Sequence, residues 1–254
     1  MIVERREGGI VIVTLNRPSK KNAINEPMWD ELLAAFTEVG ESTTDRVLVL
    51  TGAGDAFCSG ADLSGNAGDH RHQLQRMHHY NRVGLALHAI PKPTIAKVNG
   101  IAVGAGLNFA LGCDLVVASD RARFSEIFAR RGLSVDLGGS WLLPRLIGMH
   151  KAKELVLLAD IIGAAEAERI GLVNRVVPHD ELDAFVDEWA RRLAAGPPLA
   201  LAMSKRLLAN SHSVTLAEAL DAEAVSQSVA IASEDTREGI RAFLHKQTPV
   251  FKGK

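Results

Sequence analysis

Hydrophobic positions along this chain form segments of two kinds that alternate through its first half. Short apolar runs, many of them β-branched, predict buried strands. These runs are 10–15, 46–51, 94–98 and 115–118. In 28–39, behind Pro27, apolar residues instead recur at helical spacing, at Leu32, Leu33 and Phe36. Strands and helices that alternate with short joins are typical of right-handed βαβ crossovers, so a parallel sheet is expected.

Helical periodicity dominates the rest of the chain. We expect helices at 69–90, 104–111, 138–158 and 164–170, and then at 199–209, 216–232 and 234–244. The strongest boundary signal is Gly196-Pro197-Pro198, which separates the mixed pattern from a purely helical one. The sequence therefore predicts an α/β core over residues 1–195 and a helical region over residues 196–254.

Composition narrows the class of protein without indicating a function. Hydrophobic residues make up 47% of the chain and charged residues 23%, the balance of a globular protein. The formal net charge is −1, so no global field favours nucleic acid or an anionic membrane as a partner. The first residues lack the apolar core of a signal peptide, and no apolar run reaches ~20 residues. We expect buried free thiols at Cys58 and Cys113 and a cytoplasmic protein, although a single disulfide stays open.

The candidate chemistry begins in 93–114, which reads as a buried strand, a turn at Asn99-Gly100 and a helix that starts at Gly104-Ala105-Gly106. Small residues at a helix start expose backbone N–H groups, and the helix dipole favours a negative ligand there. A phosphate loop would carry lysine after the last glycine, but Leu107 follows here. The dinucleotide fingerprint lacks its third glycine, so we favour a site for an oxyanion.

A second loop, 57–62, shares this logic, because it follows an apolar stretch and is predicted to open a helix. Two N–H groups from separate helix starts would grip one developing oxyanion. The alternative is that the glycines of each loop only serve turns.

These residues carry a resemblance. IAKVNGIAVGAGLNFALGCDL resembles the signature of the enoyl-CoA hydratase/isomerase, or crotonase, superfamily, and FCSGADL resembles its other oxyanion loop. LNRPSKKNAIN is similar to its early loop on the CoA side, GGSWLLPRLIG and AERIGLVNRVV to later blocks, and FLHKQTPVFKGK to its C-terminal tail. The blocks follow the family's order over nearly the whole chain.

The resemblance implies a crotonase-like spiral of ββα turns with a C-terminal helical trimerisation region, assembled as trimers or as hexamers of two trimers. It implies an acyl-CoA substrate whose thioester oxygen binds the N–H groups of Ala61 and Ala105, or of Gly106 in place of Ala105. No cofactor is expected to be bound permanently, since coenzyme A is part of the substrate. The residues expected along coenzyme A are Lys20, Lys21, Ala23, Ala61, Asp62, Leu63, Gly106, Phe243 and Lys246. For Asp62 the preferred role is to cap or fix a turn, and for Phe243 it is packing.

The acids bear on which reaction is expected. Hydratases of this family place glutamates where this chain has Asn108 and Phe128, and neither side chain can exchange a proton. Glu126 is close in sequence, but a shift of two residues is expected to turn it elsewhere. Asp136 aligns with the base of dienoyl-CoA isomerases of the family, and the acid pattern is closest to the isomerase of bacterial phenylacetate degradation. The alternative role for Asp136 is that of a cap or a dipole partner for the helix that opens at Gly138.

Asp136 as the base therefore makes a double-bond shift the leading prediction, with 2-enoyl-CoA hydration of the β-oxidation type as the alternative. A non-catalytic acyl-CoA binder would not need this carboxylate, and a hydrolase, dehalogenase or decarboxylase on the same scaffold ranks lower. The histidines of DHRHQLQRMHHY lack a carboxylate or cysteine at a familiar metal-binding spacing. We expect no metal site there and a pocket rim or a solvated face instead.

Overall fold

A six-stranded sheet in the order β1-β2-β3-β5-β7-β10 forms the centre of the computed structural model, which describes residues 1–64 and 72–254. Its strands are β1 (Ile2–Arg6), β2 (Ile10–Leu15), β3 (Val47–Gly52), β5 (Thr94–Val98), β7 (Leu115–Ser119) and β10 (Arg175–Val177). β1 runs antiparallel to β2, and the other neighbouring pairs are parallel. The predicted parallel sheet is confirmed.

A second sheet of four short strands has the order β4-β6-β8-β9. It consists of β4 (Ala56–Cys58), β6 (Ile101–Val103), β8 (Arg123–Ser125) and β9 (Ile162–Gly163). We expected 52–60 to be a loop throughout, and this is wrong for β4. Three residues carry no readable periodicity, and the strand exists because β6 pairs with it in parallel. β3, β5 and β7 are each followed by a short strand of the second sheet and then by a helix, which is the expected spiral of ββα turns.

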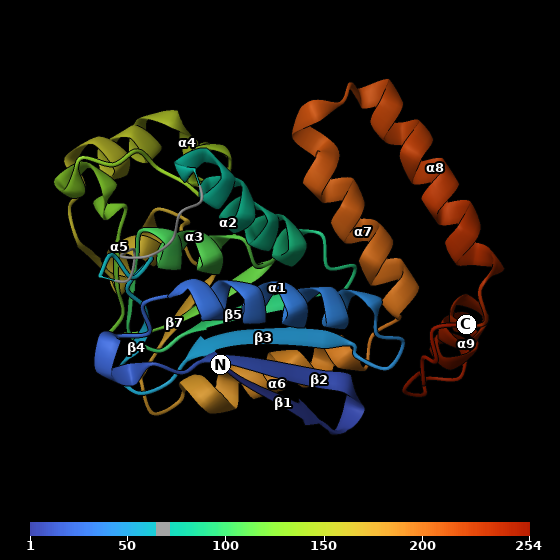
Figure 1. Cartoon of the computed structure of the whole chain (residues 1–254). Helices are drawn as coiled ribbons and strands as arrows, with labels where there is room; N and C mark the ends of the chain where they lie inside the picture. The colour runs from blue at the N-terminus through green and yellow to red at the C-terminus, as the bar shows by residue number, and fades with distance from the viewer. Residues whose placement is uncertain (65–71) are drawn as a thin grey trace.

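Helices cover both faces of the large sheet (Figure 1). α1 (Glu26–Glu41), α2 (Gln73–His88) and α3 (Ala105–Leu111) lie on one side, and α6 (Leu182–Ala194) lies on the other. Asn25 caps α1, which buries Leu32 and Phe36 as their spacing predicts. Every residue of α3 is buried, so this short helix is part of the core. The part of the predicted 69–90 helix before residue 72 lies outside the described residues.

Two further helices complete the core. α4 (Gly139–Leu158) is kinked at Gly148, whose φ of 75° suits glycine, and α5 (Ala164–Arg169) follows β9. Short 3₁₀ helices connect other elements: η1 (Glu7–Gly9), η2 (Pro18–Lys20), η3 (Ile127–Arg131) and η4 (Ser211–Ser213).

The C-terminal helices α7 (Pro198–Asn210), α8 (Leu216–Ala232) and α9 (Glu234–Leu244) start within a residue of their predicted positions. They extend beside the core (Figure 1). Lys205 of α7 forms an ion pair with Asp114 at 2.8 Å and so ties this arm to the end of α3. α8 exposes Leu216, Leu220 and Val225, of which Leu216 is 76% exposed. The division into 1–195 and 196–254 stays a prediction, as does trimerisation.

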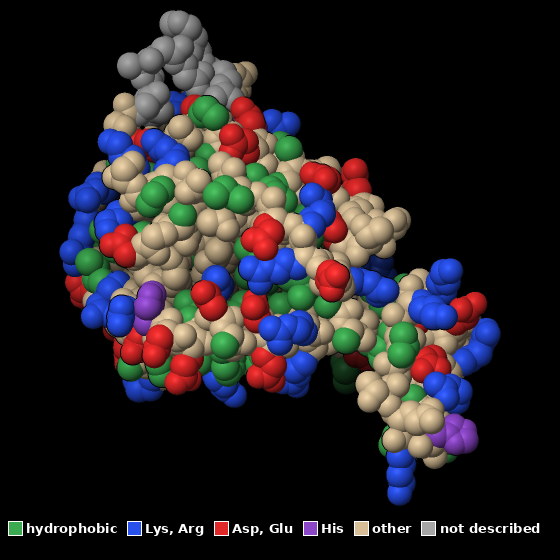
Figure 2. All heavy atoms as spheres, turned by 90° about the horizontal axis from the view of Figure 1, so that it is seen from below, with side chains coloured by type: hydrophobic (Ala, Val, Ile, Leu, Met, Phe, Trp, Pro, Cys, Tyr) green, Lys and Arg blue, Asp and Glu red, His purple; other side chains and the backbone are tan. Residues whose placement is uncertain are grey.

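Charged side chains of both signs are mixed over the face that carries α6 and β1, as Figure 2 shows. This distribution agrees with a net charge near zero. Within the described residues, no helix has the length and apolar character needed to cross a membrane.

Candidate active site

The two predicted oxyanion loops meet in the structure. β4 and β6 are parallel neighbours, so the residues that follow them, Gly60 and Gly104, leave the same edge of the small sheet. A Cβ added to Gly60 would lie 3.8 Å from the Ala105 nitrogen. A Cβ on Gly106 would lie only 2.3 Å from the Cys58 carbonyl oxygen. Glycine at these positions therefore allows the loops to approach each other closely.

The N–H groups of Ala61 and Ala105, which are the two predicted oxyanion donors, are both free to bind a ligand among the described residues. Ile24 bridges the first loop, because its N–H donates to the Gly60 oxygen and its carbonyl accepts from the Asp62 N–H. Ala61 lies between these bonds, and its N–H donates no hydrogen bond within the described residues. The same holds for the N–H of Ala105, the first residue of α3. Two unpaired N–H groups on adjacent loops suit a negatively charged oxygen.

The first loop does not open a helix as we expected. Ala61 forms an isolated bridge with Ile24, Leu63 and Ser64 form a turn, and α2 begins only at Gln73. The expectation is wrong through Ser64, because bonds to the segment before α1 hold the loop extended. The dipole argument therefore applies to Ala105 and not to Ala61.

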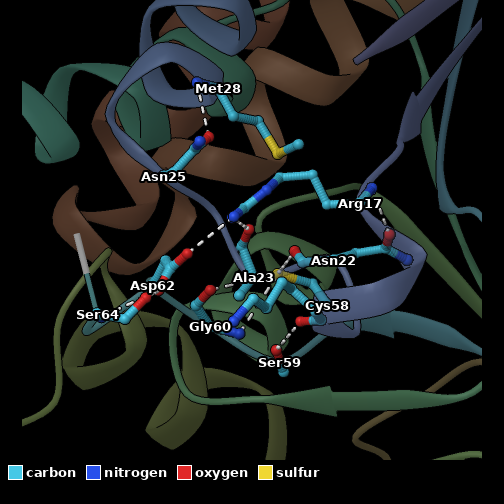
Figure 3. A network of polar contacts seen from close by, with 11 residues as sticks. Arg17, Asn22, Ala23, Asn25, Met28, Cys58, Ser59, Gly60, Asp62 and Ser64 are labelled. Carbon is cyan, nitrogen blue, oxygen red and sulfur yellow. Dashed lines mark hydrogen bonds and ion pairs between the residues drawn. The ribbon is translucent and has the colours of Figure 1, made fainter.

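An Arg17–Asp62 ion pair fixes the Ala61 loop (Figure 3). Arg17 Nη2 donates to Asp62 Oδ2 at 2.9 Å, and Nη1 donates to the Ala23 carbonyl. Asp62 Oδ1 accepts from the Ser64 N–H and hydroxyl. Bonds from Ser64 and then from Arg17 lower the pKa of Asp62 to about 2. Asp62 therefore shapes the turn as an anion. Sequence reasoning missed Arg17, although it lies within LNRPSKKNAIN.

A cavity of about 820 Å³ begins at this loop. Its wall comprises segments 24–27, 61–64 and 133–138 and one face of α2. Trp29 and Tyr80 stack in it with ring centroids 4.3 Å apart. Arg76 Nη2 donates to Glu26 Oε1 at 3.0 Å in the same wall. Sequence reasoning missed this aromatic and ionic wall, whose only signal is the helical spacing of Arg76 and Tyr80.

Asp136 lines the same cavity from the segment before α4. Its side chain does not cap that helix, since Gly138 occupies the cap position without a side-chain bond. The capping alternative is therefore wrong. Asp136 Oδ1 is buried and has no hydrogen-bond partner within the described residues. Burial raises the pKa of Asp136 from its ordinary 3.8 to about 6. A carboxylate with a raised pKa and a face toward a cavity is suited to moving protons.

A second cavity of about 470 Å³ adjoins the first, with which it shares Asn81, Leu137 and Gly138. Leu85, Leu87, Phe109, Trp141 and Leu142 make it largely apolar, and Asn108 supplies a polar group. The two cavities place an apolar chamber next to Asp136.

Glu126 lines neither cavity, in agreement with the expectation that it points elsewhere. Its buried carboxyl lies beside Asn108, whose Nδ2 is 3.5 Å from Glu126 Oε2, a contact that the sequence did not indicate. Burial foremost, and then the charge of Asp136, raise the pKa of Glu126 to about 8. Phe128 is buried against Gly104, where an added Cβ would lie 3.5 Å from the Phe128 Cζ.

Of the residues predicted to bind coenzyme A, one group lines the larger cavity and the other lies outside it. Ala61, Asp62 and Leu63 line the larger cavity, and Leu63 is 61% exposed there. Gly106 contacts Cys58, and the Ala23 carbonyl accepts from Arg17. Lys20 is exposed at the end of η2, and Lys21 forms an ion pair with Asp55 at 2.5 Å.

Phe243 and Lys246 are not brought to this site within one chain. Phe243 is 82% exposed on α9, which lies at the opposite end of the molecule from α4 and α5 (Figure 1). Lys246 follows the end of α9. Neither residue lines the larger cavity.

The remaining candidates have local partners. His72 caps α2, and His79 Nε2 lies 3.0 Å from Asp30. His70 lies outside the described residues, within which no three potential ligands are grouped to hold a metal. Cys58 and Cys113 are free and buried, as expected, and burial raises the pKa of each thiol to about 12.

The spiral of ββα turns, with two adjacent loops at its small sheet that carry N–H groups unpaired within the described part of the chain, is typical of one class of enzyme. The chain belongs to the enoyl-CoA hydratase/isomerase family, whose sequence model matches residues 5–254, and it is an enzyme of the crotonase superfamily. It is 39% identical to 1,2-epoxyphenylacetyl-CoA isomerase of Escherichia coli, over 100% of this chain and 98% of the relative. It is 36% identical to 2,3-dehydroadipyl-CoA hydratase of the same organism, over 100% and 99% of the two chains.

Solved structures of the same family share the fold of this chain. The crystal structure of an enoyl-CoA hydratase from Bacillus anthracis superposes with a TM-score of 0.95 at 34% identity and covers 100% of this chain and 99% of its own. Relatives named for hydration and for isomerisation are thus similarly related to this chain.

Proposed function

We propose that this enzyme shifts a carbon–carbon double bond in an acyl-CoA thioester, with Asp136 as the base. The observation that carries the proposal is the Asp136 carboxyl, which lines the larger cavity without a partner for Oδ1 among the described residues. The thioester oxygen would accept hydrogen bonds from the N–H groups of Ala61 and Ala105. Coenzyme A would be part of the substrate and not a permanently bound cofactor.

The reaction needs one proton carrier. Asp136 would remove a proton from a carbon next to the thioester or the double bond, leaving an enolate whose oxygen is held by the two backbone N–H groups. It would then return that proton at another carbon, so that no atom is gained or lost. With a pKa of about 6, Asp136 is mostly ionised at pH 7 and still acidic enough to give the proton back.

Hydration of a 2-enoyl-CoA is the second candidate, because several relatives are named as hydratases and a second buried acid, Glu126, lies near Asp136. Adding water requires one group that activates water and another that delivers a proton. Asn108 and Phe128 can do neither, and Glu126 lines neither of the two cavities. These features favour isomerisation.

The test is deuterium incorporation into 2-enoyl-, 3-enoyl- and dienoyl-CoA in heavy water, with products identified by mass and NMR. Asp136→Asn keeps the shape of the side chain and removes the proton acceptor. We expect exchange to fall by ~10²-fold or more while CoA binding persists. Asp160→Asn, an exposed carboxylate that pairs with Arg130 outside both cavities, is the control. Unchanged exchange in Asp136→Asn, or 3-hydroxyacyl-CoA as the main wild-type product, would refute the proposal.

We also propose that the chain assembles as trimers or as hexamers of two trimers through 196–254. The exposed apolar side chains of α8 and α9, such as Leu216 and Phe243, support this. Light scattering at micromolar concentration tests it, and a monomer mass would contradict it. The free thiols of both cysteines support a reducing compartment such as the cytoplasm, which localisation of a tagged chain would test.

A further inference from the structure

Glu126 stands out because the chemistry proposed above does not use it. It follows β8, caps η3 through its backbone and has no exposed surface. A carboxyl group is rarely buried so completely without a strong partner. The basic residues of η3 do not supply one, because Arg130 pairs with Asp160 at 2.8 Å and Arg131 is exposed.

The Asn108 amide joins Glu126 to the segment that carries Asp136. Asn108 Nδ2 lies 3.5 Å from Glu126 Oε2 and 3.0 Å from the backbone oxygen of Asp136. Both hydrogens of one amide are thus directed to two different elements. Gly139 makes the arrangement possible, because a Cβ there would lie 2.6 Å from both terminal atoms of Asn108.

Three oxygens of this cluster lack partners within the described residues: Asn108 Oδ1, Glu126 Oε1 and Asp136 Oδ1. An unsatisfied buried polar atom is costly, and an apolar trio of similar volume would stabilise the fold better. A cluster that costs stability and borders both cavities indicates a role in function.

We propose that Glu126 is a positioning residue: its carboxyl holds the Asn108 amide, which holds the backbone of Asp136 in place for proton transfer. The inference rests on the proposed function of Asp136 as the base. Burial keeps Glu126 uncharged at neutral pH, since its pKa is raised to about 8. Asp136 is the charged group that acts on it among the described residues. A neutral Glu126 lets Asp136 ionise without like-charge repulsion.

A double-mutant cycle on Glu126 and Asn108 tests the connection. Glu126→Ala removes the acceptor and should lower kcat by roughly tenfold with little change in KM, the effect of one lost hydrogen bond. Glu126→Gln keeps a neutral acceptor of the same shape and should recover most of that loss. In an Asn108→Ala background, Glu126→Ala should lower kcat by less than about twofold, because the connection is already broken.

Ser125→Ala is the matched control. It removes a buried side-chain bond of the adjacent residue, from Ser125 Oγ to the Ala159 carbonyl at 3.2 Å, which does not involve Asn108. If Glu126 had only a structural role, Glu126→Ala and Ser125→Ala would lower the amount of active enzyme equally. Only loss of the Glu126 carboxyl should change the pH profile of kcat.

A readout without substrate separates this inference from the proposed function. The pKa of Asp136 in the free protein can be followed by carbon-13 NMR of labelled aspartate. Glu126→Ala should move it from about 6 toward 3.8, because a looser segment admits water, and Ser125→Ala should not. Equal losses of kcat in both backgrounds, or an unmoved Asp136 titration, would overturn the role of Glu126. Wild-type enzyme that moves no double bond would instead overturn the proposed function, and the titration would still decide about Glu126.

Discussion

Replacing Asp136 with asparagine should make the folded protein more stable at neutral pH. Burial raises the pKa of this carboxyl from 3.8 to about 6. A carboxyl whose pKa is higher in the folded chain than in the unfolded chain binds its proton more tightly when folded. Ionising it therefore costs folding free energy. The cost is absent below pH 3.8, grows between pH 3.8 and 6, and is constant above that window.

The size of the effect follows from the two pKa values. A difference of one pKa unit corresponds to ~1.36 kcal/mol, so the difference between the unfolded pKa of 3.8 and the folded pKa of about 6 corresponds to ~3 kcal/mol. Asp136 is half-buried, and water around it reduces the effect, so we expect a gain of ~2–3 kcal/mol at pH 7. At pH 4 the gain should nearly vanish, because the folded wild-type carboxyl is already protonated.

Urea unfolding of wild type and Asp136→Asn at pH 4 and pH 7 measures this, at one fixed protein concentration in case unfolding is coupled to subunit dissociation. The pH 4 comparison isolates the exchange of a carboxylic acid for an amide. Asp62→Asn is the control of opposite sign, because bonds from Ser64 and Arg17 lower the pKa of Asp62 to about 2. That variant should lose stability at pH 7. A gain for Asp136→Asn that is equal at both pH values, or a loss at pH 7, would refute the reasoning.

Three further outcomes are expected. Ala105→Pro removes one of the two proposed oxyanion donors at a helix position that tolerates proline, so turnover should fall by ~10²-fold while circular dichroism stays unchanged. Gly106→Ala places a Cβ 2.3 Å from the Cys58 carbonyl, so the free energy of unfolding should fall by ~1–3 kcal/mol in urea titrations. Glu126→Gln should gain stability relative to wild type as pH rises from 4.5 to about 8, a window that extends higher than that of Asp136. Wild-type behaviour in any of these variants would contradict the contact on which it rests.

The sequence alone determined most of the elements and the family. Apolar runs marked β2, β3, β5 and β7, and helical spacing marked α1 and the C-terminal helices. These signals are local, because the same few residues both carry the pattern and form the backbone hydrogen bonds. The blocks that resemble the family's motifs also indicate the two candidate oxyanion loops and Asp136.

Only the tertiary structure decided what lies beside what at the site. β4 is a strand because β6 pairs with it, and the Ala61 loop stays extended because Ile24 bridges it. Arg17 and Asp62 are 45 residues apart, yet they form one ion pair. Such contacts depend on how separate elements pack, and no period within either segment encodes them.

Glu126 is a clear example of a residue whose surroundings only the tertiary structure determines. Its distance in sequence from Asn108 indicated nothing, and a shift of two residues from Phe128 suggested that it pointed away. The structure places it against Asn108 because η3 begins at Ile127, directly after it, and turns the chain there. The sequence supplies the acids, whereas the packing of β8, α3 and the segment before α4 determines which of them face one another, and burial then raises their pKa values.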